Sequence, residues 1–375
     1  MGALLHVVVK EFLQLRYDRK MIPVMILAPL VQIVGLGYAA NLDVHDVPLL
    51  LVDQDRTAQS RGLADRFTGS GYFQLAGTAF DTGEIEYWLR HDRAKVALVI
   101  AAGYGEATLR GGRPRVQVIA DGTDSNSAVV GLGYASRIVA AAGVDMVAER
   151  VQRSGRRLAQ GRIELVPRVW YNPDLRSRWF FVPAVVALVL ILITMMLPSM
   201  AIVREKEIGT LEQISVTPLR PWQLMVGKLV PFAVIGILNT WVLTAISRLL
   251  FGVPMRGSIV LLTVLTLLYL LNTLSLGLFV STVVNTQQQA MMFSAFVLMV
   301  PMIYLSGLIF PIENMPTGLQ YVTYVIPTRY YGNVVRGIFL KGSGIEVLWR
   351  DALALAAIGL GVLTLASLRF RKSLD

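Results

Sequence analysis

The chain has no cysteine and only three histidines, and charged residues make up just 16% of its 375 positions. Without cysteine it can form no disulfide, thiol nucleophile or thiolate metal site. His6, His45 and His91 are too scattered to suggest a metal cluster. No local spacing suggests a Ser/His/Asp trio or a catalytic pair of carboxylates. We therefore expect no metal site and no catalytic residue in this chain.

The scarcity of charge also indicates where the protein resides. Hydrophobic residues account for 54% of the chain, and its mean hydropathy is +0.57. A soluble protein carries charge on about a quarter of its residues. The net charge is +10, but the aromatic residues do not interleave with the basic ones as in nucleic-acid-binding proteins. The composition predicts an integral membrane protein with its basic excess at the membrane surface.

Six apolar runs are long enough to cross a bilayer. A helix needs about 20 residues to span a hydrocarbon core about 30 Å thick, and lipid requires helices because it offers no partner to free backbone groups. The predicted spans are residues 21–40, 179–201, 222–251, 259–284, 290–310 and 347–368. The first run is too long for a cleaved signal peptide, so we interpret it as a span. The expected fold class is a polytopic α-helical membrane protein with an inserted α/β extracytoplasmic domain.

Basic residues predict the orientation. An even number of spans places both termini on one side, where the short segments hold eleven lysines and arginines against five on the other side. The positive-inside rule therefore places both termini, residues 1–20 and the tail 369–375, in the cytoplasm. The lack of cysteine, and of a glycosylation sequon in the external domain, fits a bacterial inner membrane.

Residues 41–178 are predicted to form the external domain. Buried strands are expected at 47–52 and 95–100, and alternating strands at 115–119 and 164–170, with helical patterns between them. Asp55-Arg-Thr57 and Asp124-Ser125 are interpreted as helix starts, the second before a long helix that runs to about Arg153. Asp121 is interpreted as a turn residue rather than a calcium ligand.

Two cytoplasmic segments carry distinct patterns. Apolar residues recur every three or four positions within residues 1–20, which predicts a helix lying along the inner membrane surface; a simple basic anchor is the alternative. The loop 202–221 is charged and punctuated: Gly209 interrupts it, Thr210 can cap a helix with Gln213, and Thr217-Pro218 ends the turn. Such stiffness suggests that the loop transmits force to a soluble partner, whereas a solvated charge cluster is the plainer interpretation.

The chain has no phosphate-binding loop of its own. Gly227-Lys228 lacks both the preceding glycine and the following hydroxyl residue that such a loop requires. We therefore expect any ATP to be hydrolysed by another chain, and this one to be a transport subunit rather than an enzyme.

The cytoplasmic loop resembles that of the ABC type-two exporter permeases, in particular the bacterial multidrug-type subgroup with a large external domain after the first span. The resemblance is carried by Arg204-Glu-Lys-Glu207, Gly209-Thr-Leu-Glu-Gln213, Thr217-Pro-Leu-Arg-Pro-Trp222 and Gly227-Lys228. A second group follows the fifth span: Ser306-Gly307, Phe310-Pro-Ile312, Met315-Pro316, Pro327, Arg329-Tyr330, Arg336-Gly337 and Lys341-Gly342. With Val52-Asp-Gln-Asp55 and Asp121-Gly-Thr-Asp-Ser125, the likeness covers nearly the whole chain.

The resemblance implies a half-transporter that pairs with a second permease chain, as a homodimer or heterodimer, and sits on two ATP-binding subunits. ATP and magnesium would be bound by those subunits and no cofactor by this chain. The loop from Glu205 to Ser215 would be the coupling helix, with Glu205, Glu207 and Glu212 meeting basic residues of the ATPase. The coupling residues implied are Arg204, Glu205, Lys206, Glu207, Gly209, Thr210, Leu211, Glu212, Thr217 and Pro218.

Polar residues at membrane depth suggest either a transport pathway or hydrogen bonds between helices; these include Asn239, Thr240 and Asn272. The resemblance adds the second and fifth spans as the lining of the cavity, with Phe180, Thr194, Met195, Met292 and Phe293 as substrate contacts. Residues 311–346 suit short helices that dip into the outer leaflet as a lid, although an aromatic belt would explain the tyrosines equally. The expected gate residues are Pro311, Met315, Pro316, Arg329 and Tyr330.

Three functions remain open at this point. The first is export of hydrophobic or amphipathic, drug-like or lipid-like compounds by alternating access. The second is export of a polysaccharide or glycolipid. The third is a membrane-anchored receptor or assembly protein whose external domain binds a ligand or a periplasmic adaptor.

Overall fold

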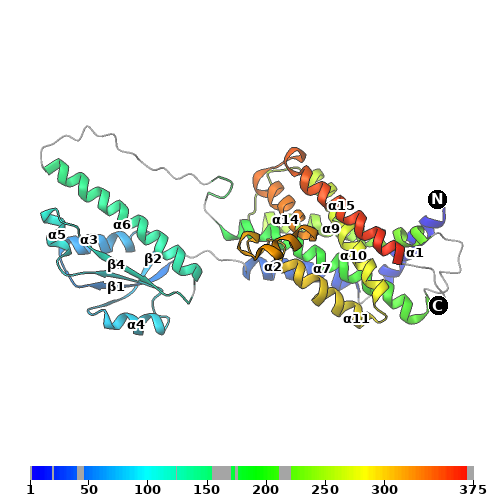
Figure 1. The fold of residues 1–375 in the computed structure, drawn as a ribbon, viewed down its shortest axis with the longest axis horizontal. Helices are drawn as coiled ribbons and strands as arrows, with labels where there is room; N and C mark the ends of the chain where they lie inside the picture. The colour runs from blue at the N-terminus through cyan, green and yellow to red at the C-terminus, as the bar shows by residue number, and fades with distance from the viewer. Residues whose placement is uncertain are drawn as a thin grey trace. The chain divides into compact units, whose positions relative to one another are not determined.

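The computed structural model describes residues 2–18, 21–39, 46–123, 125–153, 170–173, 176–210 and 221–369. The chain divides into two compact units. One is helical and combines Met1–Asn41 with Arg168–Asp375; the other is Leu42–Pro167, which lies between the first and second long apolar helices in sequence (Figure 1).

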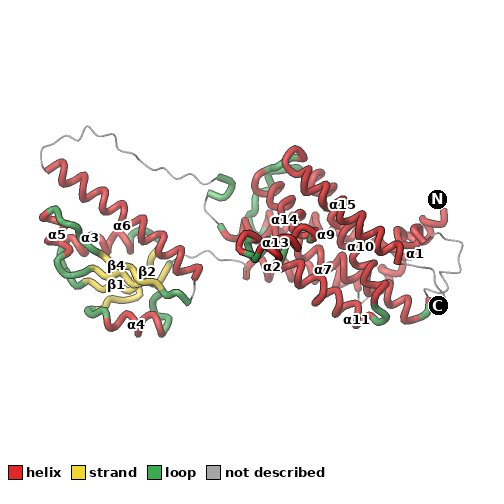
Figure 2. The backbone as a smooth tube through the Cα atoms, viewed as in Figure 1, coloured by secondary structure: helices red, strands yellow, loops and turns green. Residues whose placement is uncertain are grey.

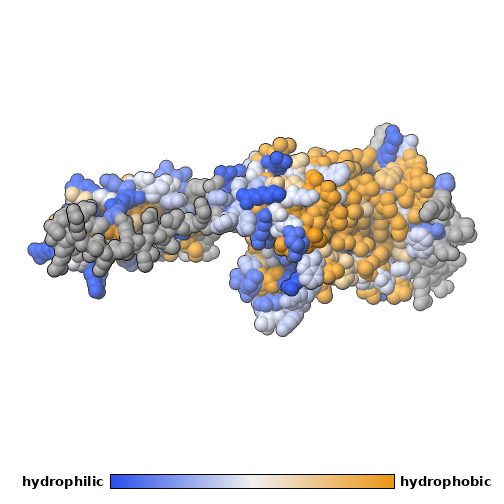
Figure 3. Space-filling model, turned by 90° about the horizontal axis from the view of Figure 1, so that it is seen from above, coloured by the Kyte–Doolittle hydropathy of each residue, from blue (hydrophilic) through white to orange (hydrophobic). Residues whose placement is uncertain are grey.

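The helical unit is built from long helices. They are α1 (Gly2–Tyr17), α2 (Met21–Ala39), α7 (Ser177–Ile208), α9 (Pro221–Leu249), α10 (Ile259–Val283) and α15 (Ile345–Arg369). Helix α7 is the central one, because it packs against α2, α9, α10, α11 and α14. In Figure 1 the red end of α15 lies at the same end of this unit as the blue helix α1. Apolar side chains cover a broad band of the surface of the unit, as expected for a protein that contacts lipid (Figure 3).

Short helices connect α10 to α15 (Figure 2). In order they are α11 (Gln287–Met292), a π-helical segment η1 (Phe293–Met299), α12 (Val300–Tyr304), η2 (Ile312–Asn314), α13 (Thr317–Val322), η3 (Thr323–Val325), α14 (Pro327–Arg336) and a second π-helical segment η4 (Gly337–Lys341). The predicted fifth span, 290–310, is corrected by this arrangement. The helical stretch begins at Gln287 and stops at Tyr304, because Gly307 takes a positive φ of 76° that a helix cannot contain.

The predicted second span is also longer than expected. Helix α7 does not stop at residue 201 but continues to Ile208 through the charged residues Arg204 to Glu207. Charge alone therefore does not end this helix, since each of these side chains finds a partner within the protein. The first half of the predicted loop 202–221 is thus the end of a membrane helix.

Six described helices are long and apolar enough to cross a membrane. Five of them, α2, α7, α9, α10 and α15, coincide with predicted spans. The sixth is Ser127–Val147, which belongs to α6 of the other unit and was expected only as a domain helix. The segment from α11 to α12 is absent from this set because its π-helical turn divides it into short helices.

The second unit is an α/β fold of three layers. Its elements are β1 (Val47–Asp53), α3 (Ala58–Thr68), β2 (Phe73–Ala79), α4 (Gly83–Arg90), β3 (Val96–Ile100), α5 (Tyr104–Arg110), β4 (Val116–Ala120) and α6 (Ser125–Arg153). The strand order is β2-β1-β3-β4; β1 is parallel to both β2 and β3, and β4 is antiparallel to β3. One face of the sheet packs on α3 and α6 and the other on α4, because successive residues of β1 and β3 point to opposite faces.

The strands predicted at 47–52, 95–100 and 115–119 match β1, β3 and β4 to within a residue. Strand β2 was not predicted. It lies at the edge of the sheet and most of its residues are exposed, so it lacks the apolar alternation that marks a strand. Of the strand predicted at 164–170, only Trp170 lies within the described residues, and it is not in a strand.

Candidate coupling site

The charged end of α7 is the first part of the predicted coupling site. Helix α7 ends at Ile208, and Gly209 caps it with a φ of 79° while its N–H donates to the carbonyl of Lys206 at 3.2 Å. Only glycine adopts this left-handed conformation without strain, so the sequence predicted the break correctly. The Thr210 hydroxyl donates to the carbonyl of Glu205 at 3.3 Å. Leu211, Glu212, Gln213, Ser215, Thr217 and Pro218 of the predicted loop lie outside the described residues.

Four charged side chains from three helices meet beside this helix end. We name Lys10, Glu11, Glu205 and Lys228 the ion cluster. Lys228 donates to Glu205 and, at 3.2 Å, to Glu11, while Lys10 donates to Glu205 at 2.8 Å and to Glu11 at 2.9 Å. Glu11, Glu205 and Lys228 are 6%, 5% and 3% exposed. The two positive and two negative charges neutralise one another, which makes their burial tolerable.

The cluster is a joint between elements that are distant in sequence. Lys10 and Glu11 belong to α1, Glu205 to α7 and Lys228 to α9. Burial opposes the charged form of Lys10, but its hydrogen bonds with Glu205 and Glu11 prevail and raise its pKa. Helix α1 also lies directly on α9, since a Cβ on Gly227 would sit 2.5 Å from a methyl carbon of Val7. The end of α7 is therefore bonded to both α1 and α9.

This arrangement corrects the role expected for Glu205. The resemblance implied that its carboxylate meets basic residues of an ATPase, whereas its partners are Lys10 and Lys228 of the same chain. A solvated charge cluster is equally wrong for this residue, because the side chain is buried. Of the partners, Lys228 was considered as part of a false phosphate loop and of the family resemblance, but not as a partner of Glu205.

The residues next to Glu205 in sequence contact the turns between other helices. Arg204 pairs with Asp18, between α1 and α2, at 2.6 Å. Lys206 donates to Asn285 at 2.5 Å, and Glu207 accepts from the backbone N–H of Gln287 at 2.8 Å, both in the region where α10 leads into α11. These exposed contacts each contribute little energy. Together they connect the end of α7 to the turns that follow α1 and α10, so it is positioned from two sides.

Helix α1 keeps an apolar face that nothing in the described chain covers. Leu5, Val9, Phe12 and Leu13 are between 39% and 63% exposed. Apolar residues exposed along one helix that is tied to the end of a membrane bundle suit a helix lying in the membrane interface.

The polar residues expected along a transport pathway are buried between helices. Thr194 donates to Leu190 and Thr273, Asn239 to the carbonyl of Met25, Thr240 to that of Gly236, and Asn272 to those of Leu268 and Leu355. Thr194 is 1% exposed and Met195 is fully buried. In this conformation Thr194 joins α7 to α10, Asn239 joins α9 to α2 and Asn272 joins α10 to α15, whereas the hydrogen bond of Thr240 lies within α9.

The three remaining predicted substrate contacts, Phe180, Met292 and Phe293, are not gathered into one site. Phe180 stands near the start of α7, 43% exposed, with the Arg336 guanidinium 3.8 Å from its ring centre. Met292, 51% exposed, and Phe293 lie on α11 and η1, where Phe293 packs against a buried cluster that includes Val203, near the opposite end of α7. The structure therefore separates Phe180 from the other two.

Two of the predicted gate residues, Arg329 and Tyr330, both contact Tyr324. Arg329 donates to the hydroxyl of Thr323, its guanidinium lies 4.3 Å from the ring centre of Tyr324, and the Tyr330 hydroxyl donates to the carbonyl of Tyr324 at 2.8 Å. Pro316 caps α13, Pro311 precedes η2 and is exposed, and Met315 is half-buried. Arg336 adds a second tie, because it donates to the carbonyls of Leu308 and Phe180 at 2.9 and 3.4 Å. These contacts hold the segment after α12 against the start of α7.

Comparison with known proteins adds relatives of nearly full length. Residues 19–368 match the family described as ABC-2 family transporter protein. The chain is 30% identical over 349 residues to the probable multidrug ABC transporter permease YbhR of Escherichia coli K12, which covers 93% of each chain. It is 29% identical over 370 residues to the probable multidrug ABC transporter permease YbhS of the same organism, covering 98% of this chain and 96% of that one. Identity to the inner membrane transport permease YhhJ is 27% over 369 residues.

Proposed function

We propose a mechanism that starts from one established point: the chain belongs to the ABC-2 family of transporters and is the permease subunit of an ABC exporter. As a permease it is not itself an ATPase, and its family implies an ATP-binding partner. In our proposal it moves hydrophobic or amphipathic compounds outward by alternating access. The description of two relatives as probable multidrug permeases supports this class of cargo.

The proposal places the chain in a bacterial inner membrane with both termini in the cytoplasm and the α/β unit outside. A second permease chain completes the pathway, and the cytoplasmic loop after α7 docks on the ATPase that binds ATP and magnesium. Support for this orientation comes from the positive-inside pattern, to which Arg204 and Lys206 at the C-terminal end of α7 contribute.

The observation that carries the mechanism is the ion cluster. The loop that would contact the ATPase starts two residues after Ile208, and Glu205 of the same helix end is fixed to α1 and α9. In this mechanism a force on that loop moves α1, α7 and α9 together. Binding of ATP to the partner would in this way shift the permease between two conformations.

The test is transport by a reconstituted complex. The chain is purified with its candidate ATPase subunit, placed in liposomes and supplied with a fluorescent amphipathic compound. We expect accumulation that requires ATP and ceases when the lysine of the ATPase phosphate loop is replaced. Transport that survives ATP depletion and collapses with an ion gradient would overturn the proposal, as would failure of the two chains to form a stable complex.

A further inference from the structure

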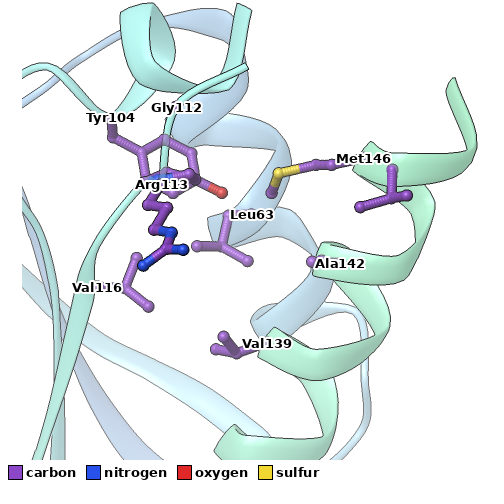
Figure 4. Close-up of a pocket in the computed structure, with 11 residues that line it drawn as sticks. Leu63, Tyr104, Gly112, Arg113, Val116, Val139, Ala142 and Met146 are labelled. Carbon is purple, nitrogen blue, oxygen red and sulfur yellow. The ribbon is translucent and has the colours of Figure 1, made fainter. Parts of the chain in front are cut away.

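The α/β unit contains a cavity to which no function has been attached. Its volume is about 320 Å³, and it lies between α3, α5, β4 and α6 (Figure 4). Leu63, Val116, Val139, Ala142 and Met146 give it an apolar wall. Small-molecule sites have volumes of about 300–1,000 Å³ and are mostly apolar with a few polar groups, so this cavity falls at the small end of that class.

The polar groups of the cavity define what it would recognise. Arg113 is its one charged lining residue, and Tyr104 supplies a hydroxyl. Figure 4 shows the Arg113 guanidinium beside Leu63 and the Tyr104 hydroxyl directed toward α6. In the described part of the chain Arg113 has no carboxylate partner, unlike its neighbour Arg110, which pairs with Glu106 at 2.6 Å. Arg113 is exposed, so its guanidinium lies at the rim of the cavity, where it favours a carboxylate or sulfate.

Helix α6 has more apolar surface than the sheet covers. Its stretch Ser127–Val147 is hydrophobic enough to pass for a membrane span, yet only 22% of its most apolar window is buried. Ala135 and Ala142 face the core of the unit, whereas Val144 and Val147 are 47% and 55% exposed. Val147 also lines the cavity. Apolar surface thus extends from inside the cavity to the outer side of α6.

We propose that this cavity binds an amphipathic monoanion, with its apolar chain along Val139 and Met146 of α6 and its single negative group on Arg113. A zwitterion or a cation would meet no carboxylate on the lining. Binding as such needs neither ATP nor transport; only the further idea that the ligand is cargo rests on the proposed function.

The test uses the full-length chain in lipid nanodiscs without any ATPase. The probe is dodecanoate carrying a photoreactive diazirine, and the matched neutral probe is the corresponding dodecanol. After illumination, labelled peptides are mapped by mass spectrometry. We expect the dodecanoate probe to label the stretch 139–147, and Arg113→Gln to reduce that labelling about tenfold while labelling by the alcohol changes little.

Two further variants complete the design. Ala142→Trp fills the cavity and is expected to abolish labelling by both probes, with the thermal unfolding of the protein checked in parallel. Arg115→Gln removes an exposed charge that does not line the cavity and is expected to change nothing. Dodecanoate labelling of the α/β unit that persists unchanged in Arg113→Gln, or labelling confined to the helical unit, would overturn the proposal. Because no transport is measured, that failure would leave the proposed function untouched.

Discussion

At the scale of single residues, neighbouring charges of one sequence motif have different roles. Glu205 and Glu207 lie two positions apart in the same charged run, yet Glu205 is buried with two lysines and Glu207 is exposed beside Gln287. The sequence identified both as charged residues at a helix end. It could not distinguish them, because the burial of Glu205 depends on Lys10 and Lys228, which come from helices far away in the chain.

The ion cluster gives a prediction about stability. Lys228→Met leaves two buried carboxylates, Glu11 and Glu205, facing Lys10 alone. Since removing one partner of a buried ion pair costs about 3–5 kcal/mol, we expect a loss in this range or somewhat below it. Adding Glu11→Gln restores neutrality and should recover part of the loss. The free energy of unfolding in detergent measures both effects.

Arg204→Met is the matched control for that experiment. It removes a neighbouring charge, but its ion pair with Asp18 is partly exposed, with the two side chains 48% and 20% exposed, so we expect a change within about 1 kcal/mol. Equal losses in Arg204→Met and Lys228→Met would contradict the assignment of the cluster as a joint.

Asp55 gives a prediction about pH. Its carboxylate accepts hydrogen bonds from the Thr57 hydroxyl and from the backbone N–H groups of Gly103 and Gly105 at the start of α5. These hydrogen bonds, that of Thr57 foremost, lower the pKa of Asp55. The contribution of Asp55 to the stability of the folded state is therefore complete above its unfolded pKa of about 3.9. It is lost as the pH falls through the lower pKa of the folded state.

We accordingly expect Asp55→Asn to weaken the α/β unit by about 1 kcal/mol at neutral pH, the size of a lost helix cap. The difference from the unchanged protein should shrink as the pH falls below about 4. Hydrogen exchange of the β1 and β3 amides reports the stability. Asp65→Asn, at an exposed site on α3, serves as the control, and a difference that stays constant with pH would be inconsistent with this role of Asp55.

At the scale of elements, the lengths of the apolar runs in the sequence predicted most of the long helices. Hydrogen bonding and packing determine where those helices end. Helix α7 passes through its charged residues because each finds a partner, and the fifth helical stretch ends at Tyr304, shortly before Gly307. Strand β2 escaped prediction because an exposed edge strand has no buried face to produce alternation. The π-helical segments η1 and η4 have no signal in composition or period, since they depend on how neighbouring helices fit.

The contact between α7 and α10 gives an element-scale prediction. A Cβ on Gly277 would stand 2.4 Å from the backbone oxygen of Met195, so Gly277→Ala must push the two central helices apart. Overpacking of this kind costs about 1–3 kcal/mol. Thermal unfolding in detergent tests it, with Gly361→Ala in α15 as the control, because nothing lies within 4 Å of a Cβ there. Two variants of equal stability would show that the close approach is unimportant.

At the scale of the whole molecule, the sequence predicted a polytopic helical membrane protein and its family, while the candidate site was only partly accessible to it. Long apolar runs specify a polytopic helical protein however the helices pack. The motif around Gly209 indicated the correct end of helix α7. The polar pathway candidates Thr194, Thr240 and Asn272 are fully or almost fully buried in this conformation; Thr194 and Asn272 donate to neighbouring helices, and Thr240 donates to Gly236 of its own helix. Their residue types suit both roles, so only the packing could decide between them.

The natural absence of cysteine makes the proposed orientation directly testable, since each introduced cysteine is the only thiol in the chain. Glu84 on α4 and Ile208 at the end of α7 are exposed, and neither side chain makes a hydrogen bond or ion pair within the described chain. We expect Glu84→Cys to react with a membrane-impermeant maleimide added to intact spheroplasts, and Ile208→Cys to react only after the membrane is opened. Both should react equally in detergent, which controls for accessibility. The reverse pattern would place the α/β unit inside the cell, where the loop after α7 could not meet an ATPase.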